Sequence, residues 1–392
     1  MPNQFLSPEG DLENYFVTEY WLIDQYVGDE LWGWGSGPLG NTVSTPVNTF
    51  TGGSNWKQVS SGGANTAAIK TDGTLWTWGL GGYGGLGNNS TTSVSTPVTT
   101  FAGGTNWKQV SCGILHTAAI KTDGTLWTWG GQLYGELGVG IYGYSGKGTP
   151  VTTFAGGTNW KQVSAGAVFT SAIKTDGTLW VWGNGANGRL GTNAVTDKYT
   201  PVTTFAGGTS WKQVSSGTSP QPSYTAAIKT DGTLWTWGNG ANGRLGNAVT
   251  TNASTPVTTF AGGTNWKQVS CGGYNTAAIK TDGTLWTWGY GDSGRLGNAS
   301  TINASTPVTT FAGGTNWKQV SAGYQHTAAI KTDGTLWTWG RGDYGGLGNN
   351  SATDRSTPVT TFAGGSNWKQ VSAGYQLTAA VFSGINAEYP LS

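Results

Sequence analysis

The sequence predicts an all-β protein built as a single seven-bladed β-propeller with four antiparallel strands in each blade. Three observations support this fold. The phrase TDGTLWTWG starts at residues 71, 122, 230, 281 and 332, and a near copy starts at residue 175. The phrase WKQVS occurs seven times, at spacings of 51 to 55 residues. A period near 50 residues with glycine and tryptophan signatures is typical of propeller blades.

Each repeat contains four short segments with the composition of strands. In the first contiguous copy they are WKQVS (56–60), TAAIK (66–70), TLWTW (74–78) and TPVTTF (96–101). Trp76 and Trp78 share one strand face, because side chains alternate with a period of two. The KTDGT link predicts a tight Asp-Gly hairpin, and the proline of the fourth segment suits an edge strand.

The two ends of the chain are predicted to share the seventh blade. The N-terminal part has ELWGW (30–34) and TPVNTF (45–50) but lacks the first two strands. The C-terminal part has WKQVS (368–372) and LTAAVFS (377–383) but lacks the last two. Joining them closes the ring and leaves no open sheet edge.

Composition excludes several classes of protein. Only 10% of the residues are charged, whereas glycine and tryptophan are abundant at 67 and 22 residues, so the chain is folded rather than disordered. The net charge of +1 and the absence of a basic run argue against nucleic-acid binding. We expect no membrane insertion, since no apolar run reaches 18 residues and the N-terminus does not have the pattern of a signal peptide.

The order of the phrases resembles the regulator of chromosome condensation (RCC1) repeat family. The residues that carry the resemblance are WGxGxxGxLG, the proline that follows it, and SxGxxxTAA before the Asp-Gly turn. The resemblance covers all seven repeats and implies a seven-bladed propeller. Members of that family include exchange factors for a small GTPase, a secreted β-lactamase inhibitor, and uncharacterised bacterial and phage proteins, to which the near-verbatim copies are most similar in character.

The two faces of the predicted disc differ in sequence behaviour. KTDGT and FAGGTNW fall on one face and are nearly invariant, whereas the SxGxxx loop and the long loop before TPV fall on the other and differ in every copy. Tyrosine and arginine concentrate in these variable loops, as in loops that bind other molecules. Sequence drift in loops is the alternative explanation. The candidate binding residues are Tyr83, Tyr134, Tyr142, Tyr144, Arg189, Tyr224, Arg244, Tyr274, Tyr290, Arg295, Tyr324, Arg341, Tyr344 and Tyr375.

The first 28 residues are predicted to be an acidic extension outside the propeller, which spans 29–383 and is followed by a tail at 384–392. Apolar residues at helical spacing predict a helix over 11–27. This helix either covers the ring or docks onto a larger assembly. The candidate docking residues are Phe16, Tyr20, Trp21 and Ile23.

The sequence offers little catalytic chemistry. Each Asp of the repeated Asp-Gly pairs is explained by turn formation, because Asp stabilises such turns. Cys112 and Cys271 occupy one equivalent position in different repeats, as do His116 and His326, so neither pair predicts a disulfide or a metal site. We expect no enzyme activity, no metal and no cofactor.

These observations favour a non-catalytic display or binding module, anchored by the face that carries the termini and binding a protein or glycan through the variable face. The phage resemblance suggests a virion component that recognises a host. Two alternatives remain: a regulator of a small GTPase, and an inhibitor or enzyme that uses the mouth of the axial tunnel.

Overall fold

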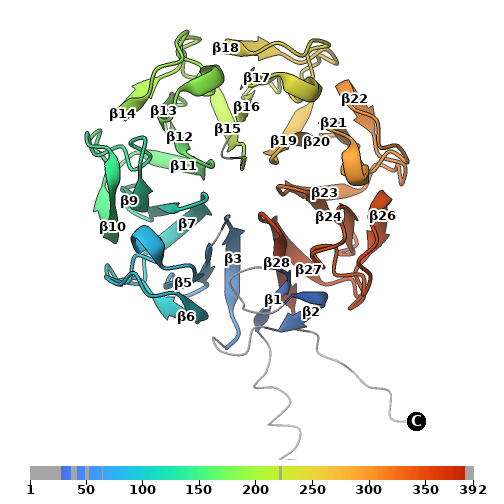
Figure 1. The fold of residues 1–392 in the computed structure, drawn as a ribbon, viewed down its shortest axis with the longest axis horizontal. Coiled ribbons are helices and arrows are strands. Elements are labelled where there is room, and N and C mark those ends of the chain that lie inside the picture. The colour runs from blue at the N-terminus through green and yellow to red at the C-terminus, as the bar shows by residue number, and fades with distance from the viewer. Residues whose placement is uncertain (1–27, 37–41, 49–52, 64, 220–222, 385–392) are drawn as a thin grey trace, which may run out of the picture.

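The computed structural model describes residues 28–36, 42–48, 53–63, 65–219 and 223–384. They form seven four-stranded sheets arranged in a ring around an axis (Figure 1). The first strand of each sheet lies nearest the axis and the fourth lies at the rim (Figure 1). The predicted seven-bladed propeller is therefore confirmed. The predicted helix over 11–27, with its docking residues, and the tail lie almost entirely outside the described residues.

Six blades are contiguous in sequence, and their strands follow one another from the axis outward. Blade I contains β3 (Trp56–Ser61), β4 (Asn65–Lys70), β5 (Leu75–Gly79) and β6 (Val94–Thr99). Blade II contains β7 (Trp107–Cys112), β8 (His116–Lys121), β9 (Leu126–Gln132) and β10 (Gly143–Thr152). Blade III contains β11 (Trp160–Ala165), β12 (Phe169–Lys174), β13 (Leu179–Gly183) and β14 (Lys198–Thr203).

The next three blades repeat this order. Blade IV contains β15 (Trp211–Ser216), β16 (Tyr224–Lys229), β17 (Leu234–Gly238) and β18 (Ala253–Thr258). Blade V contains β19 (Trp266–Cys271), β20 (Asn275–Lys280), β21 (Leu285–Gly289) and β22 (Ala304–Thr309). Blade VI contains β23 (Trp317–Ala322), β24 (His326–Lys331), β25 (Leu336–Gly340) and β26 (Arg355–Thr360). Short 3-10 turns follow the third strand in four blades: η2 (Gly82–Gly84), η3 (Ala186–Gly188), η4 (Ala241–Gly243) and η5 (Asp292–Gly294).

Blade VII is built from both ends of the chain, as the sequence predicts. Its strands are β27 (Trp368–Ala373), β28 (Leu377–Ser383), β1 (Asp29–Gly35) and β2 (Val43–Asn48). Strands β1 and β28 are antiparallel and pair continuously from Asp29 opposite Ser383 to Gly35 opposite Leu377. This pairing closes the ring without a covalent link (Figure 1).

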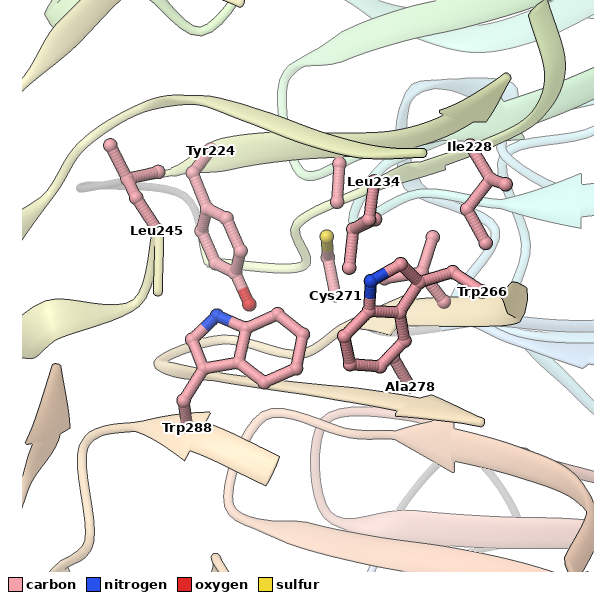
Figure 2. Packing of buried hydrophobic residues seen from close by; sticks show 10 residues of the cluster. Tyr224, Ile228, Leu234, Leu245, Trp266, Cys271, Ala278 and Trp288 are labelled. Atoms are coloured by element: carbon pink, nitrogen blue, oxygen red, sulfur yellow. The ribbon is translucent and has the colours of Figure 1, made fainter. Parts of the chain in front are cut away.

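The hydrophobic core lies between neighbouring blades rather than inside any one of them. Figure 2 shows the boundary of blades IV and V, where Leu234 and Leu245 of one blade meet Trp266 and Trp288 of the next. Equivalent clusters fill the other boundaries. Because every blade packs against the same set of side chains, the frame phrases are kept nearly identical from copy to copy.

The invariant WKQVS phrase also joins the innermost strands through hydrogen bonds. The Gln58 amide donates to the Val110 carbonyl at 3.1 Å, and its oxygen accepts from the Val110 N–H at 3.2 Å. The same pair of bonds recurs at every blade boundary and ends with Gln370 on Val59. A serine hydroxyl accepts a third bond across each boundary, for example Ser60 from the Cys112 N–H at 2.9 Å. These bonds explain why glutamine and serine never vary in this phrase.

Candidate binding surface on the variable face

Antiparallel strands place alternate links on opposite faces of the disc. We use "invariant face" for the side with the Asp-Gly turns and the FAGGTNW links, and "variable face" for the side with the short and long loops. The Trp107 N–H donates to the Gly73 carbonyl at 3.0 Å, so a turn of blade I meets the link that starts blade II. On the variable face, the short loops follow the innermost strands and lie near the axis, whereas the long loops follow the third strands and lie further out.

Neighbouring short loops are joined through their backbones. The Tyr324 N–H of blade VI donates to the Gly374 carbonyl of blade VII at 3.0 Å, and the Gly273 N–H of blade V donates to Gly323 at 3.0 Å. A Cβ on Gly323 would lie 2.6 Å from the Gly374 carbonyl oxygen, so this position favours glycine. The backbone fixes the loops, and the side chains that follow these glycines are free to differ.

A second backbone position holds the long loops in place. The carbonyl of Arg244 accepts bonds from the Trp288 indole at 3.0 Å and the Thr276 hydroxyl at 2.9 Å, both of the next blade. Because the carbonyl makes these contacts, the side chain at this position can vary. It is Gly85, Glu136, Arg189, Arg244, Arg295 and Gly346 in blades I to VI.

The arginines at this position lie below the short loop of the next blade. Arg244 packs against Tyr274, with 5.2 Å from guanidinium carbon to ring centroid. Arg295 packs against Tyr290 at 4.9 Å, and its Nη1 donates to the Tyr324 carbonyl at 3.5 Å. Such cation–π contacts hold the tyrosine rings in place.

Tyr274, Tyr324 and Tyr375 of blades V, VI and VII form what we call the tyrosine cluster. The hydroxyl oxygens of Tyr274 and Tyr324 are 2.7 Å apart and share a hydrogen bond. The rings of Tyr324 and Tyr375 are stacked, with centroids 4.0 Å apart. All three side chains are half-buried. The structure therefore brings together three predicted residues that lie about 50 residues apart in sequence.

The tyrosine cluster is an uncharged hydrogen-bonding surface above cationic side chains. Burial, together with hydrogen bonds to Tyr274 and Tyr375, raises the pKa of Tyr324, so its hydroxyl stays protonated at neutral pH. Burial lowers the pKa of Arg244 and Arg295, but an arginine keeps its charge at neutral pH. This arrangement suits a ligand with hydrogen-bond acceptors or negative charge.

The other predicted residues lie outside this cluster. Tyr83, Tyr142 and Tyr144 are exposed, and Tyr142 stacks on Tyr199 at 4.2 Å. Arg341 pairs with Asp343 at 2.7 Å and packs against Tyr344. The half-buried members outside the cluster are Tyr134, Tyr290, Arg341 and Tyr344.

Four predicted surface residues are buried, which corrects the sequence-based placement. Arg189, Arg244 and Arg295 are at most 3% exposed because their long loops fold between blades. Tyr224 is fully buried at the boundary of blades IV and V (Figure 2), where its hydroxyl donates to the Asn275 carbonyl at 2.6 Å. Of these four residues, Arg244 and Arg295 contact the tyrosine cluster from below.

The two histidines are also structural. The Nε2 atom of His116 lies 2.9 Å from the Thr170 hydroxyl of the next blade, and His326 contacts Thr378 in the same way at 2.7 Å. Asn65 fills this position in blade I and donates to Thr117 at 2.9 Å. Burial lowers the pKa of both histidines to about 4, so they stay neutral at neutral pH.

Sequence reasoning missed a set of exposed phenylalanines. One follows the fourth strand of each contiguous blade, in the FAGGTNW link, and is 65% to 76% exposed: Phe101, Phe154, Phe205, Phe260, Phe311 and Phe362. The repeated TPVTTF pattern suggested a strand residue, yet each strand ends two residues earlier. The recurrence of phenylalanine beside two glycines in these six links is the sequence signal that could have pointed to them.

No group of three or more His, Cys, Asp or Glu side chains that could hold a metal occurs among the described residues. Cys112 and Cys271 are buried free thiols, and burial raises the pKa of each to about 12. Of the helices in the described ranges, none has the length and apolarity needed to cross a membrane.

The fold is that of a repeat propeller whose loops differ from copy to copy on one face. The family model for the RCC1-like domain matches residues 145–386, and models for the RCC1 repeat match 72–120, 56–84 and 107–136. This chain belongs to the RCC1 repeat family.

Two similar proteins are the ultraviolet-B receptor UVR8 of Arabidopsis thaliana and the human E3 ubiquitin-protein ligase HERC2. The first is 32% identical over 76% of this chain and 68% of its own length. The second is 29% identical over 76% of this chain, which spans 6% of that much longer protein.

Solved structures agree on the fold. Yeast RCC1 (Prp20), in its complex with Kap60, superposes with a TM-score of 0.80 over 99% of this chain and 95% of the compared chain, at 19% identity. Human WBSCR16 gives a TM-score of 0.77 at 20% identity, over 91% of this chain and 99% of that structure.

Proposed function

We propose that this protein is a non-catalytic binding module that contacts a partner protein through the variable face. The tyrosine cluster is the observation that carries the proposal. Tyrosine rings with few rotatable bonds provide contact area at low entropic cost, and here packing already fixes them. A partner segment with carboxylates or exposed carbonyls suits the neutral hydroxyls and the cationic arginines beneath.

The experiment compares two loop variants with the unmodified chain. Tyr324→Ala with Tyr375→Ala removes two thirds of the cluster, whereas Tyr142→Ser with Tyr144→Ser removes exposed tyrosines elsewhere on the same face. Quantitative affinity purification from the native source should lose a bound protein with the first pair only. Recovery of the same proteins with both variants would show that the cluster is not the contact surface.

Regulation of a small GTPase is a second candidate, and it rests on similarity. A solved structure of Prp20p concerns its binding to Gsp1p and histones, and a 25% identical relative from Caenorhabditis elegans is named as a GTPase regulator homologue. A nucleotide-release assay with a GTPase from the source organism tests it. Faster release of bound GDP would favour this role over simple display.

The more specific expectations from the sequence stay predictions. A virion location, host recognition and glycan binding have no support among the relatives described above. Anchoring through Phe16, Tyr20, Trp21 and Ile23 concerns residues outside the described ranges. A glycan array probed with the same two variants tests the glycan expectation directly.

A further inference from the structure

Seven lysines lie on the innermost strands, at the strand ends nearest the invariant face, and we call them the lysine ring. Each is the second residue of an innermost strand, just before the glutamine that bridges two blades. The members are Lys57, Lys108, Lys161, Lys212, Lys267, Lys318 and Lys369. All seven are exposed, and their backbones are fixed because the neighbouring glutamines are bonded around the whole axis.

The lysines that precede the Asp-Gly turns, also on the invariant face, are held by cation–π contacts with tryptophans. Lys70 lies over the rings of Trp56 and Trp76, with its Nζ 4.9 and 5.1 Å from their centroids. Five further blades repeat this contact at 4.4 to 4.9 Å. These lysines are part of the frame, whereas the amines of the lysine ring extend into solvent.

Only one member of the lysine ring forms an ion pair within the described ranges. The Lys369 Nζ lies 2.6 Å from the Asp29 carboxylate. Asp29 is the first residue of β1, so this carboxylate stands where the N-terminal segment joins the propeller. A Cβ on Gly28 would contact Ser54 and Asn55, which belong to the link before blade I. The segment therefore enters on the invariant face.

The charge of this segment complements that of the ring. Residues 9–24 contain Glu9, Asp11, Glu13, Glu19 and Asp24 and no lysine or arginine. The described residues contain all twenty lysines and arginines but thirteen of the nineteen carboxylates, which leaves an excess of seven positive charges. The near-neutral whole chain thus divides into a cationic propeller and an acidic segment.

The distance from the start of β1 to the lysine ring is short compared with the length of segment 9–24. Strand β1 is two strands from β27, and neighbouring strands are about 4.8 Å apart, so the entry point lies roughly 10 Å from the innermost strand. Sixteen residues span about 24 Å as a helix and about 50 Å when extended. Either conformation reaches several members of the lysine ring.

We propose that the acidic segment 9–24 binds in cis to the lysine ring on the invariant face. The chain then carries its own occupant for that surface. An external polyanion that binds the lysine ring has to displace the segment.

Zero-length carbodiimide cross-linking of the full chain, followed by peptide mass spectrometry, tests the contact. Amide links should join carboxylates of residues 9–24 to lysine-ring members near blade VII, such as Lys57 and Lys318. These links should form within one chain. Their yield should decrease strongly in 0.5 M salt, because salt screens the attraction between exposed charges. Links to Lys147 and Lys198 of the variable face at equal yield, links between chains, or no links from the segment would each overturn the proposal.

A binding measurement provides the second test. The neutral variant Glu9→Gln, Asp11→Asn, Glu13→Gln, Glu19→Gln, Asp24→Asn keeps the segment length but removes its charge. Inorganic polyphosphate should bind this variant about tenfold more tightly than the unmodified chain, a difference of about 1.4 kcal/mol. Lys57→Gln with Lys318→Gln in the neutral variant should reverse the gain. Equal affinity of the unmodified and neutral chains would contradict masking in cis.

Discussion

The invariant and variable faces are formed by the ends of the same strands, yet their side chains serve different purposes. On the invariant face, Lys70 and its equivalents stack on tryptophans, and Asp72 caps the turn by accepting from the Thr74 N–H at 2.8 Å. On the variable face, backbone carbonyls make many of the recurring bonds between blades. The comparison teaches that side chains can vary at positions such as Gly85, Glu136 and Arg244, where the backbone carbonyl makes the bond that recurs from blade to blade.

The largest expected change in stability comes from His116 and His326, which follow variable loops and begin strands β8 and β24. The pKa of His116 and His326 is about 4 in the folded protein, against 6.5 in an unfolded chain. Between pH 6.5 and 4, the two histidines bind protons in the unfolded chain but not in the folded protein. The free energy of unfolding therefore falls as the pH drops from about 6.5 to 4. Each histidine should contribute roughly 3 kcal/mol to this loss.

The chain itself supplies the matched substitution. Asn65 and Asn275 occupy the same position and donate to Thr117 and Thr327. His116→Asn with His326→Asn should keep the protein folded at pH 7 and reduce the loss between pH 6.5 and 4, measured by urea unfolding at several pH values. An unchanged pH dependence would mean that these histidines are accessible to protons in the folded state.

A slightly smaller effect is expected from the tryptophans between blades. Trp34 and Trp288 are fully buried, and each donates to a carbonyl of the preceding blade at 2.9 and 3.0 Å. Trp34→Ala and Trp288→Ala should each cost about 3–5 kcal/mol in unfolding free energy. Trp34 lies in blade VII, where no covalent link joins β1 to β28, so its loss should also expose the chain ends to limited proteolysis. Identical cleavage patterns in the two variants would rule out blade VII as the weak point.

Glu136 is expected to make the free energy of unfolding depend on pH in the opposite direction to the histidines, by a moderate amount. Burial raises its pKa to about 7, although its Oε2 accepts a hydrogen bond from the Tyr134 N–H at 2.8 Å. The folded protein keeps a proton that the unfolded chain releases above pH 4.5, so stability falls as the pH rises from 4.5 to 7. Glu136→Gln should gain roughly 2–3 kcal/mol at pH 8 and little at pH 4.5. Equal gains at both pH values would indicate a packing effect instead.

The smallest effect concerns a strained tyrosine on the variable face. Tyr83 has a φ of +58°, whereas Asn187 and Asn242 take the same turn position with φ values of +59° and +60°. Asparagine adopts this left-handed conformation more readily than tyrosine. Tyr83→Asn should therefore raise the unfolding free energy by about 0.5–1 kcal/mol, as thermal unfolding can measure. A loss of stability would show that the tyrosine ring makes contacts that outweigh the strain.

Sequence patterns predicted the candidate surface only in part. Composition indicates tyrosine-rich loops, and the predicted binding residues include Tyr274, Tyr324 and Tyr375. Burial was not predicted for Arg189 or Tyr224, because a glycine-rich loop gives no period from which to infer depth. The exposed Phe101 and its equivalents were missed because they follow a strand whose last residue the pattern does not define.

The sequence by itself determined the number of blades, the order of strands and the shared blade that closes the ring. Repetition made this possible, since each copy shows the same alternation of strand and turn. Only the tertiary structure decided which side chains meet, because contacts between blades join residues some 50 positions apart. The stacking of Tyr324 on Tyr375 and the pairing of Lys369 with Asp29 depend on ring closure, which no single repeat encodes.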